Sequence, residues 1–279
     1  MFNRPLLKSR AKAVLGTCYW RAVAISVVVS IISSLAGGLF RIRVSDTIML
    51  GSPFRTALFL LTTGCFFALN LAISVFLLQP LSLGIYKFHL DSADGKFSDI
   101  GALTYGFRGN YKNTVAVLFA REILLLLLVI VPSALSVLSI MGSGMQLSYA
   151  GIGLPNISLT ALNIPSHILT KVTFVTYLLL IPAVIKYYDW RLVQYILIEN
   201  PDISWRDALG RSKALMRSNR FAAFKLDLSF LGWLLLGVMA CGFGAIFVVP
   251  YIEATNVQLY LELSGRSTID ADENYYENI

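Results

Sequence analysis

Long uncharged stretches alternate along this chain with short clusters of Lys and Arg. Four stretches contain no Asp, Glu, Lys or Arg, namely residues 22–40, 56–86, 123–170 and 228–252. A helix needs about 20 apolar residues to cross a hydrocarbon core of about 30 Å. The pattern therefore predicts an all-α membrane protein, and six crossings fit it best, at about residues 21–40, 56–88, 113–140, 166–188, 221–241 and 243–263.

The last two crossings come from one apolar stretch that is divided by Cys241-Gly-Phe-Gly244. Two glycines suit a tight turn, so this stretch is interpreted as two short helices, with a single kinked crossing as the alternative. All the spans are expected in one membrane-embedded domain, residues 1–263. The tail, residues 264–279, is acidic and poor in apolar side chains, which predicts disorder.

The distribution of Lys and Arg predicts the orientation of the spans. The N-terminal segment carries five such residues, the second-to-third connection four and the fourth-to-fifth connection seven. The first loop carries three, and the loop at residues 142–165 carries none. Because Lys and Arg are enriched in cytoplasmic loops, both termini are expected in the cytoplasm of a multi-pass cell-membrane protein.

A faint internal repeat runs through this pattern. Segments of similar character lead into the odd-numbered spans at residues 15–21, 107–113 and 216–221, and each even-numbered span carries a proline after an apolar run, at Pro80, Pro182 and Pro250. The repeating unit would be a cytoplasmic-side amphipathic helix followed by a helical hairpin, used three times. Chance similarity among apolar sequences is the alternative.

Residues 204–216 predict an amphipathic helix that lies at the membrane surface. Ser204 can cap the helix, and Asp207 follows three residues later, as in a capping box. Apolar residues recur at helical spacing while cations occupy the other positions, a pattern typical of a helix in the headgroup region. Residues 97–110 resemble a weaker counterpart that is partly irregular, because Gly101, Gly106 and Gly109 lower helix propensity.

Several charged residues lie within or beside the spans. Arg121 and Glu122 fall about 12 Å into the third span, and a charge at such depth costs about 2.5–3.5 kcal/mol unless it finds a partner or water. Adjacent helical positions do not face each other, so this pair is expected to satisfy itself poorly. Glu253 lies at a similar depth in the sixth span and is predicted to approach Arg121, with Asn256 on the same face as Glu253. A structural ion pair that joins helices is the alternative to a functional site.

A second group of charges is predicted at the membrane interface, where it would contact lipid or a partner protein: Lys186, Asp189, Arg191, Arg206, Arg211, Lys213, Arg217 and Lys225. Snorkelling charges beside an aromatic belt are the alternative interpretation.

The composition agrees with a membrane protein and points to no cofactor. Mean hydropathy is +0.69, and only 14% of the residues are charged, against about 25% in soluble domains. The net charge of +7 is divided among the loops, which favours anionic lipid over nucleic acid as a partner. His89, Asp91 and Asp94 have the composition of an ordinary turn rather than of a metal site, and no phosphate-binding loop, zinc-protease motif or nucleophile elbow is present.

The C-terminal part of the chain carries motifs of a known family. They are Ile181-Pro-Ala-Val-Ile-Lys-Tyr-Tyr188, Tyr195-Ile-Leu-Ile-Glu-Asn-Pro-Asp202, Ala208-Leu-Gly-Arg-Ser-Lys-Ala-Leu-Met216 and Leu228-Ser-Phe-Leu-Gly-Trp233, then Gly242-Phe-Gly244, Pro250-Tyr251, Thr255 and Tyr260. In these motifs, mainly over residues 180–263, the chain resembles a bacterial membrane-protein family catalogued as domain of unknown function 975. The resemblance implies an integral plasma-membrane protein of a Gram-positive bacterium and supplies no activity or catalytic residue.

Three classes of function remain open. A non-enzymatic accessory, regulatory or lipid-binding protein is favoured by the basic surface helix and by the lack of catalytic motifs. A transporter or flippase for an amphiphilic or anionic molecule is supported by prolines in three spans and by deep charges. An enzyme acting on lipid headgroups would need a cluster of acids, bases or metal ligands that these residues do not assemble.

Overall fold

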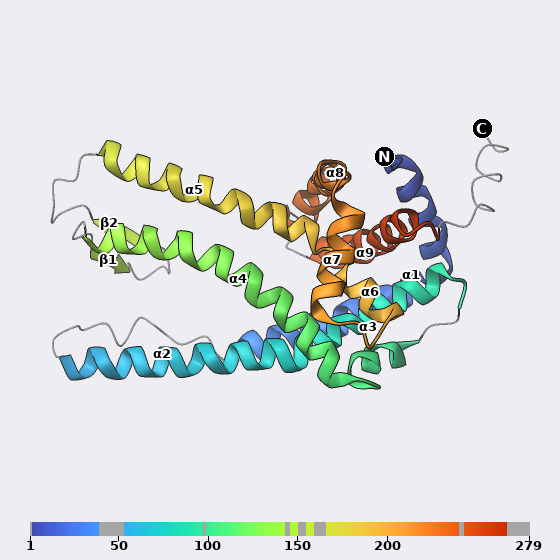
Figure 1. Ribbon diagram of the computed structural model, residues 1–279, viewed down its shortest axis with the longest axis horizontal. Coiled ribbons are helices and arrows are strands. Elements are labelled where there is room, and N and C mark those ends of the chain that lie inside the picture. Colours follow the sequence, from blue (N-terminus) through green and yellow to red (C-terminus); the bar gives the residue numbers. More distant parts are fainter. Residues whose placement is uncertain are drawn as a thin grey trace. The chain divides into compact units, whose positions relative to one another are not determined.

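The computed structural model describes residues 2–38, 53–96, 99–142, 146–149, 155–158, 166–239 and 243–266 (Figure 1). Nine α-helices are described in these ranges: α1 (Arg4–Gly38), α2 (Pro53–Ile73), α3 (Gln79–Ala93), α4 (Tyr111–Gly142), α5 (Ser166–Asp189), α6 (Val193–Glu199), α7 (Trp205–Met216), α8 (Arg220–Met239) and α9 (Phe243–Leu263). A π-helical turn, Ser74–Leu78, joins α2 to α3, and a 3-10 helix, Ile100–Phe107, precedes α4.

The chain divides into two compact units, which are described separately. The first unit comprises Met1–Arg41, Gly64–Ala120 and Tyr188–Ile279, and the second comprises Ile42–Thr63 and Arg121–Tyr187. The second unit contains the two short strands β1 (Gln146–Tyr149) and β2 (Pro155–Ser158), which pair antiparallel with Gln146 opposite Ser158. These strands lie in the uncharged segment that the sequence pattern assigned to a loop.

The core of the first unit is built by α1, α3 and α9. Ala11, Ala22 and Ile25 of α1 form one buried cluster with Phe88 of α3 and Ala254 of α9. Because alanine side chains are short, they let the helix backbones approach closely, as is typical of helices that associate in membranes.

The 3-10 helix packs against α3 with almost no space between the two backbones. A Cβ atom added at Gly84 would lie 2.4 Å from Leu103 Cα, and one added at Gly106 would lie 2.1 Å from the carbonyl oxygen of Pro80. Both positions therefore require glycine. The weak, partly irregular helix predicted for residues 97–110 is confirmed over Ile100–Phe107 as a 3-10 helix, and residues 97 and 98 lie outside the described part.

Each stretch predicted to cross the membrane is helical wherever it is described. Within the described residues, three helical stretches are long and apolar enough to span a bilayer, Arg4–Leu35, Gly64–Ala93 and Tyr111–Ile130. The chain is thus compatible with a membrane protein, whereas the count of six crossings stays a prediction. The first helix begins at Arg4 rather than near residue 21, because the basic N-terminal residues favour a helix as readily as the apolar ones do.

The prolines of the predicted repeat lie in continuous helical stretches. Pro182 lies inside α5 and Pro250 inside α9, while Pro80 occupies the first turn of α3, directly after the π-helical turn. Proline lacks an amide N–H and displaces the preceding backbone, so a π-helical turn beside Pro80 is a common accommodation. The three-fold repeat itself stays a prediction. The glycine turn at residues 241–242 and the tail at residues 267–279 lie outside the described part.

Candidate functional site

A polar cluster around Arg191 joins three segments of the first unit. Arg191 lies in the turn between α5 and α6, and its Nη1 and Nη2 atoms donate to Asp227 of α8 at 2.7 and 2.8 Å. Nη2 also donates to Asn256 Oδ1 of α9 at 2.6 Å. The hydroxyl of Tyr188 donates a further hydrogen bond to Asp227, at 3.0 Å. The planar guanidinium group suits such bidentate pairing, so Arg191 ties α8 and α9 to the end of α5.

Glu253 lies one helical turn before Asn256 and borders the same cluster. It interacts electrostatically with Arg191 and with Asp227. Its Oε2 atom is covered by protein and has no hydrogen-bond partner among the described residues. A carboxylate oxygen in this position is costly unless a charge lies nearby, and Arg191 supplies that charge.

A second ion pair fixes α7 and α8 to the same turn. Arg220, the first residue of α8, pairs with Asp189, whose side chain is 1% exposed. Ser212 of α7 donates to the carbonyl oxygen of Asp189 at 2.7 Å and accepts from the amide of Leu192 at 3.2 Å. This buried hydroxyl both donates and accepts a hydrogen bond, so Ser212 holds α7 in place.

The helix α7 presents a basic face outward. It begins after Ser204, whose side chain accepts from the amide of Asp207 as the sequence predicted. Ala208, Leu209 and Ser212 are buried together with Met216. The basic face of α7 comprises Arg206, Arg211, Lys213 and Arg217, the residue directly after the helix, and all four are exposed. The guanidinium of Arg206 lies 5.0 Å from the ring centroid of Trp205.

A third polar network lies at the C-terminal end of α9. The Tyr260 hydroxyl donates to Glu199 at 2.5 Å, and Arg266 pairs with Glu199 and, at 3.1 Å, with Asp94. Burial by itself would lower the pKa of Arg266, but Glu199 and Asp94 outweigh it and raise that pKa. Arg266 is therefore firmly charged and joins α9 to α3 and α6.

Tyr195 of α6 stacks on Tyr260, with ring centroids 5.1 Å apart. Its side chain is buried, and its hydroxyl has no hydrogen-bond partner among the described residues. Burial raises the pKa of Tyr195 well above its usual value, and the negative charge of Glu253 adds to this effect. Tyr195 is therefore a neutral side chain at physiological pH.

Arg121 and Glu122 form an ion pair with each other, which corrects the expectation that neighbouring helical positions would satisfy each other poorly. Arg121 Nε donates to Glu122 Oε1 at 3.2 Å, and Nη2 contacts the same oxygen. The expectation considered the directions of the Cβ atoms alone. A long arginine side chain can fold around the helix and reach the adjacent carboxylate.

The predicted approach of Arg121 to Glu253 stays a prediction. Arg121 belongs to the second compact unit and Glu253 to the first. Within the first unit, Glu253 is accompanied by Arg191 and by Asn256, the residue predicted to share its face.

The residues predicted at the interface differ in their surroundings. Asp189 and Arg191 are used in ion pairs inside the chain, whereas the four cations of α7 are exposed. Lys225 lies 4.4 Å above the ring of Phe221, and Lys186 is half-buried in the last turn of α5. Contact of these residues with lipid or with a partner protein stays a prediction.

Three residues of the site were not selected from the sequence. Asp227 is one of them, although it is the sole acid in the apolar helix α8. Arg220 and Glu199 were not identified as ion-pair partners. A solitary acid in an apolar helix is a recognisable signal, because its cost demands a nearby cation. Nothing in the local sequence indicates which cation that is.

His89 does not assemble a metal site with its predicted neighbours. Its ring is buried against Phe88, at a centroid distance of 5.3 Å. Asp91 pairs with Lys87 at 2.7 Å, and Asp94 with Arg266. Within the described part of the chain, no group of three or more His, Cys, Asp or Glu side chains is arranged to hold a metal ion.

The described residues thus form a helical protein, and three of its helical stretches are long and apolar enough to cross a membrane. The chain belongs to the family described as "Protein of unknown function (DUF975)", which matches residues 1–267. The family resemblance seen in the C-terminal motifs thus extends over nearly the whole chain. No curated protein and no solved structure matches the sequence.

Proposed function

We propose that this chain is a non-enzymatic, lipid-binding protein of a bacterial cell membrane, and that the basic face of α7 binds anionic headgroups. In this proposal the chain crosses the membrane six times and leaves both termini in the cytoplasm. The observation that carries the proposal is the arrangement of α7, which is fixed on one face and basic on the other.

The fixed face of α7 supports binding at a defined orientation. Ser212 and its hydrogen bonds to the α5–α6 turn, together with the buried Ala208, Leu209 and Met216, attach the helix to the helical core. The exposed cations therefore cannot turn away from the surface they face. A basic amphipathic helix of this kind gains about 1 kcal/mol per cation close to an anionic membrane.

The arrangement of the buried charges supports a structural rather than a catalytic role for the Arg191 cluster. Arg191 already makes three hydrogen bonds with Asp227 and Asn256, and Asp189 is paired with Arg220. A catalytic group needs a free lone pair or proton that can reach a substrate. These charges are instead used to join helices.

Thermal unfolding of the detergent-solubilised protein tests the proposed lipid binding. Phosphatidylglycerol should raise the unfolding temperature more than phosphatidylcholine with the same acyl chains. The double variant Lys213→Gln/Arg217→Gln should lose much of this difference. Arg108→Gln/Lys112→Gln is the matched control, because it removes two exposed cations outside α7.

Salt provides a second criterion for the same experiment. The Debye length falls from about 10 Å at 0.1 M salt to about 3 Å at 1 M, so headgroup binding by exposed cations should weaken strongly. Equal loss in the α7 double variant and in the control would refute a specific role for α7. If the preference for phosphatidylglycerol changed neither with salt nor with the α7 substitutions, headgroup binding would be refuted.

A transporter is the second candidate, and Glu253 favours it. A buried carboxylate oxygen without a hydrogen-bond partner, one turn after Pro250, is typical of residues that bind ions or protons within a membrane. Reconstitution into vesicles that contain a pH-sensitive dye tests this. Proton or solute flux that disappears in Glu253→Gln would support transport, and flux equal to that of empty vesicles would exclude a proton-coupled mechanism.

A further inference from the structure

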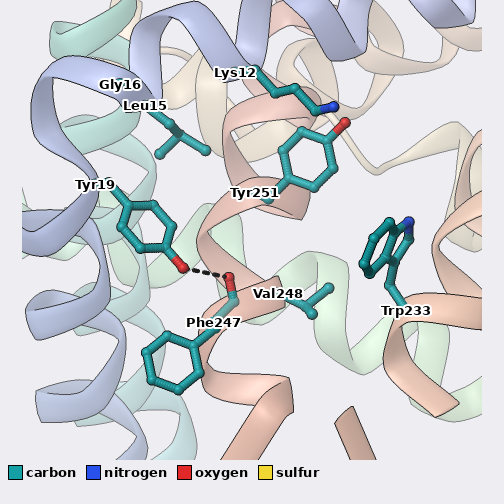
Figure 2. Close-up of a pocket in the computed structure, with 8 residues that line it drawn as sticks. All are labelled: Lys12, Leu15, Gly16, Tyr19, Trp233, Phe247, Val248 and Tyr251. Carbon is teal, nitrogen blue, oxygen red and sulfur yellow. Dashed lines mark hydrogen bonds between the residues drawn. The ribbon is translucent and has the colours of Figure 1, made fainter. Parts of the chain in front are cut away.

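A groove opens on the surface of the first unit between α1, α8 and α9 (Figure 2). It has a volume of about 490 Å³ and is lined by Lys12, Leu15, Gly16 and Tyr19 of α1, by Trp233 of α8 and by Phe247, Val248 and Tyr251 of α9. This volume is within the range of small-molecule sites, which is about 300–1,000 Å³. The walls are almost wholly apolar.

The cation of the groove lies at one end. Figure 2 shows the ammonium of Lys12 beside the hydroxyl of Tyr251, with Leu15, Tyr19 and Phe247 extending away from them. The Tyr19 hydroxyl is occupied, because it donates to the carbonyl oxygen of Phe247 at 3.3 Å. The Tyr251 hydroxyl has no hydrogen bond to any described residue. The groove thus has one cationic, hydrogen-bonding end and one apolar end.

A row of cations continues from this end along α1. Arg4, Lys8 and Lys12 recur at every fourth position, and Lys8 interacts electrostatically with the other two. Lys8 Nζ lies 4.3 Å from the ring centroid of Phe230, and Lys12 Nζ lies 5.9 Å from that of Tyr251. No described carboxylate forms an ion pair with either lysine. Like charges four residues apart destabilise a helix, so an anion at this row would relieve their repulsion.

Among the described residues, carboxylate partners are missing on only one face of α1, as the contrast with Arg10 shows. Its guanidinium pairs with Glu262 of α9 at 2.9 Å, on the other side of the helix. The groove side keeps its positive charge.

From these observations we propose that the groove holds one acyl chain of an anionic phospholipid, with its phosphate bound by Lys8, Lys12 and the hydroxyl of Tyr251. The occupant is a lipid rather than a free phosphate, because the cationic end continues directly into an apolar channel that opens onto the apolar surface of the helices. Trp233 and Phe247, which border the channel, are 58% and 46% exposed. From Lys12 to Tyr19 the channel runs about 10 Å along α1, enough for the first part of an acyl chain.

This site goes beyond the proposed function, since it holds a single lipid on other helices than α7. A resident lipid would fill the space between α1 and the α8–α9 pair. Basic pockets between helices near a cytoplasmic surface are known to bind lipid headgroups.

Native mass spectrometry of the detergent-solubilised full chain tests the site. The probes are phosphatidylglycerol and phosphatidylcholine with identical acyl chains, each titrated separately. The protein should retain one phosphatidylglycerol about 25-fold more tightly than phosphatidylcholine, since each of the two lysines near the lipid anion contributes about a factor of five. Lys8→Gln/Lys12→Gln should abolish this preference and leave weak, equal binding of both lipids.

Filling the groove is an independent test. Gly16 lines the channel, and a Cβ atom added there would meet no atom within 4 Å, so Gly16→Leu is chosen to place a side chain in the channel. This variant should bind both lipids at least about tenfold more weakly. Gly232→Leu is the matched control, because Gly232 is equally open but does not line the groove, and it should bind like the unmodified chain.

The outcomes separate this site from the proposed function of α7. Lys213→Gln/Arg217→Gln should leave the single tightly bound lipid in place even where it changes the general response to anionic lipid. Equal binding of the two lipids to the unmodified chain, or unchanged binding in Gly16→Leu, would overturn the proposal. Loss of the bound lipid in the α7 variant alone would do so as well.

Tryptophan quenching gives a measurement that needs neither the lysine variants nor the glycine variants. Brominated acyl chains quench a nearby indole, and Trp233 lines the channel. The quenching due to Trp233 is the difference between the unmodified chain and Trp233→Phe. Brominated phosphatidylglycerol should quench Trp233 more than brominated phosphatidylcholine at the same mole fraction, and equal quenching would refute the site.

Discussion

At the scale of single residues, the bidentate ion pair between Arg191 and Asp227 should be sensitive to substitution. The two side chains are 11% and 31% exposed. Removing one partner of a buried pair costs about 3–5 kcal/mol, and the partial exposure of Asp227 reduces this to about 2 kcal/mol. Asp227→Asn keeps the shape but removes the charge, so it should lower the unfolding temperature in detergent by several degrees, measured by scanning fluorimetry.

Lys225→Gln is the control for this prediction. Lys225 lies one half-turn from Asp227 but contacts the ring of Phe221, and surface contacts of this kind contribute about 0.5–1 kcal/mol at most. Its unfolding temperature should stay close to that of the unmodified chain. If Asp227→Asn and Lys225→Gln lowered the unfolding temperature equally, the position of Arg191 would not depend on its ion pair with Asp227.

Removing the hydroxyl groups of the stacked Tyr195 and Tyr260 should change the free energy of unfolding in opposite directions. The Tyr195 hydroxyl is buried without a hydrogen-bond partner among the described residues, so Tyr195→Phe should raise the free energy of unfolding by about 1 kcal/mol. Tyr260 donates to Glu199, so Tyr260→Phe should lower it by about 1–2 kcal/mol. Thermal unfolding at pH 8 distinguishes these results, and stabilisation by both substitutions would contradict the assignment.

The raised pKa of Tyr195 adds a dependence on pH. An unfolded tyrosine ionises near pH 10, whereas the buried Tyr195 ionises only at higher pH. Above about pH 10 the unfolded state therefore binds fewer protons than the folded state, and the stability falls as the pH rises. Tyr195→Phe should make this alkaline decline shallower, which unfolding curves between pH 9 and pH 11 would show. Parallel curves would contradict the burial of a neutral hydroxyl.

The sequence could predict that the deep charges need partners, but not which partners they take. Position along a helix gives the depth of a residue, and depth alone cannot say which helix lies beside it. Asp227 and Arg191 are 36 residues apart, so only the packing of α8 against the α5–α6 turn brings them together. Arg121 and Glu122 form an ion pair despite being adjacent in the helix, because the arginine side chain is long.

At the scale of elements, the contact between α3 and the 3-10 helix depends on glycine. Gly106→Ala would place a Cβ atom 2.1 Å from the backbone oxygen of Pro80, and a backbone atom cannot move aside easily. Overpacking of this kind costs about 1–3 kcal/mol, so the unfolding temperature should fall. Gly101→Ala is the matched control in the same 3-10 helix, because its Cβ atom would meet nothing within 4 Å. A fall in both variants would implicate helix geometry rather than the contact.

Local signals predicted some elements well. Ser204 and the apolar spacing that follows it gave α7 its start and its buried face, because a capping side chain acts within one turn. The contacts of Gly84 and Gly106 could not be predicted. Glycine in a segment signals either irregularity or close packing, and only the neighbouring backbone distinguishes the two.

At the scale of the whole molecule, hydropathy predicted where helices form but not how they are grouped. Apolar runs of about 20 residues are a strong signal for helices, since backbone groups in lipid must pair within their own segment. The grouping into two compact units depends on contacts between distant segments, such as α1 with α9. Apolar surfaces resemble one another, so the sequence pattern alone does not specify these contacts.

The proposed topology yields a final prediction about the two faces of the membrane. Seven cations lie between residues 191 and 225 and none between residues 142 and 165, so the positive-inside rule places α7 in the cytoplasm and β2 outside. In a cysteine-free background, a membrane-impermeant maleimide should label Ser158→Cys in intact cells and Gly210→Cys only after lysis. Charge sets this result, because translocating the basic α7 region costs far more than translocating an uncharged hairpin. Labelling of Gly210→Cys in intact cells would reverse the orientation. If both sites were labelled only after lysis, β2 would not lie outside the cell. That result would refute the proposed arrangement of six crossings.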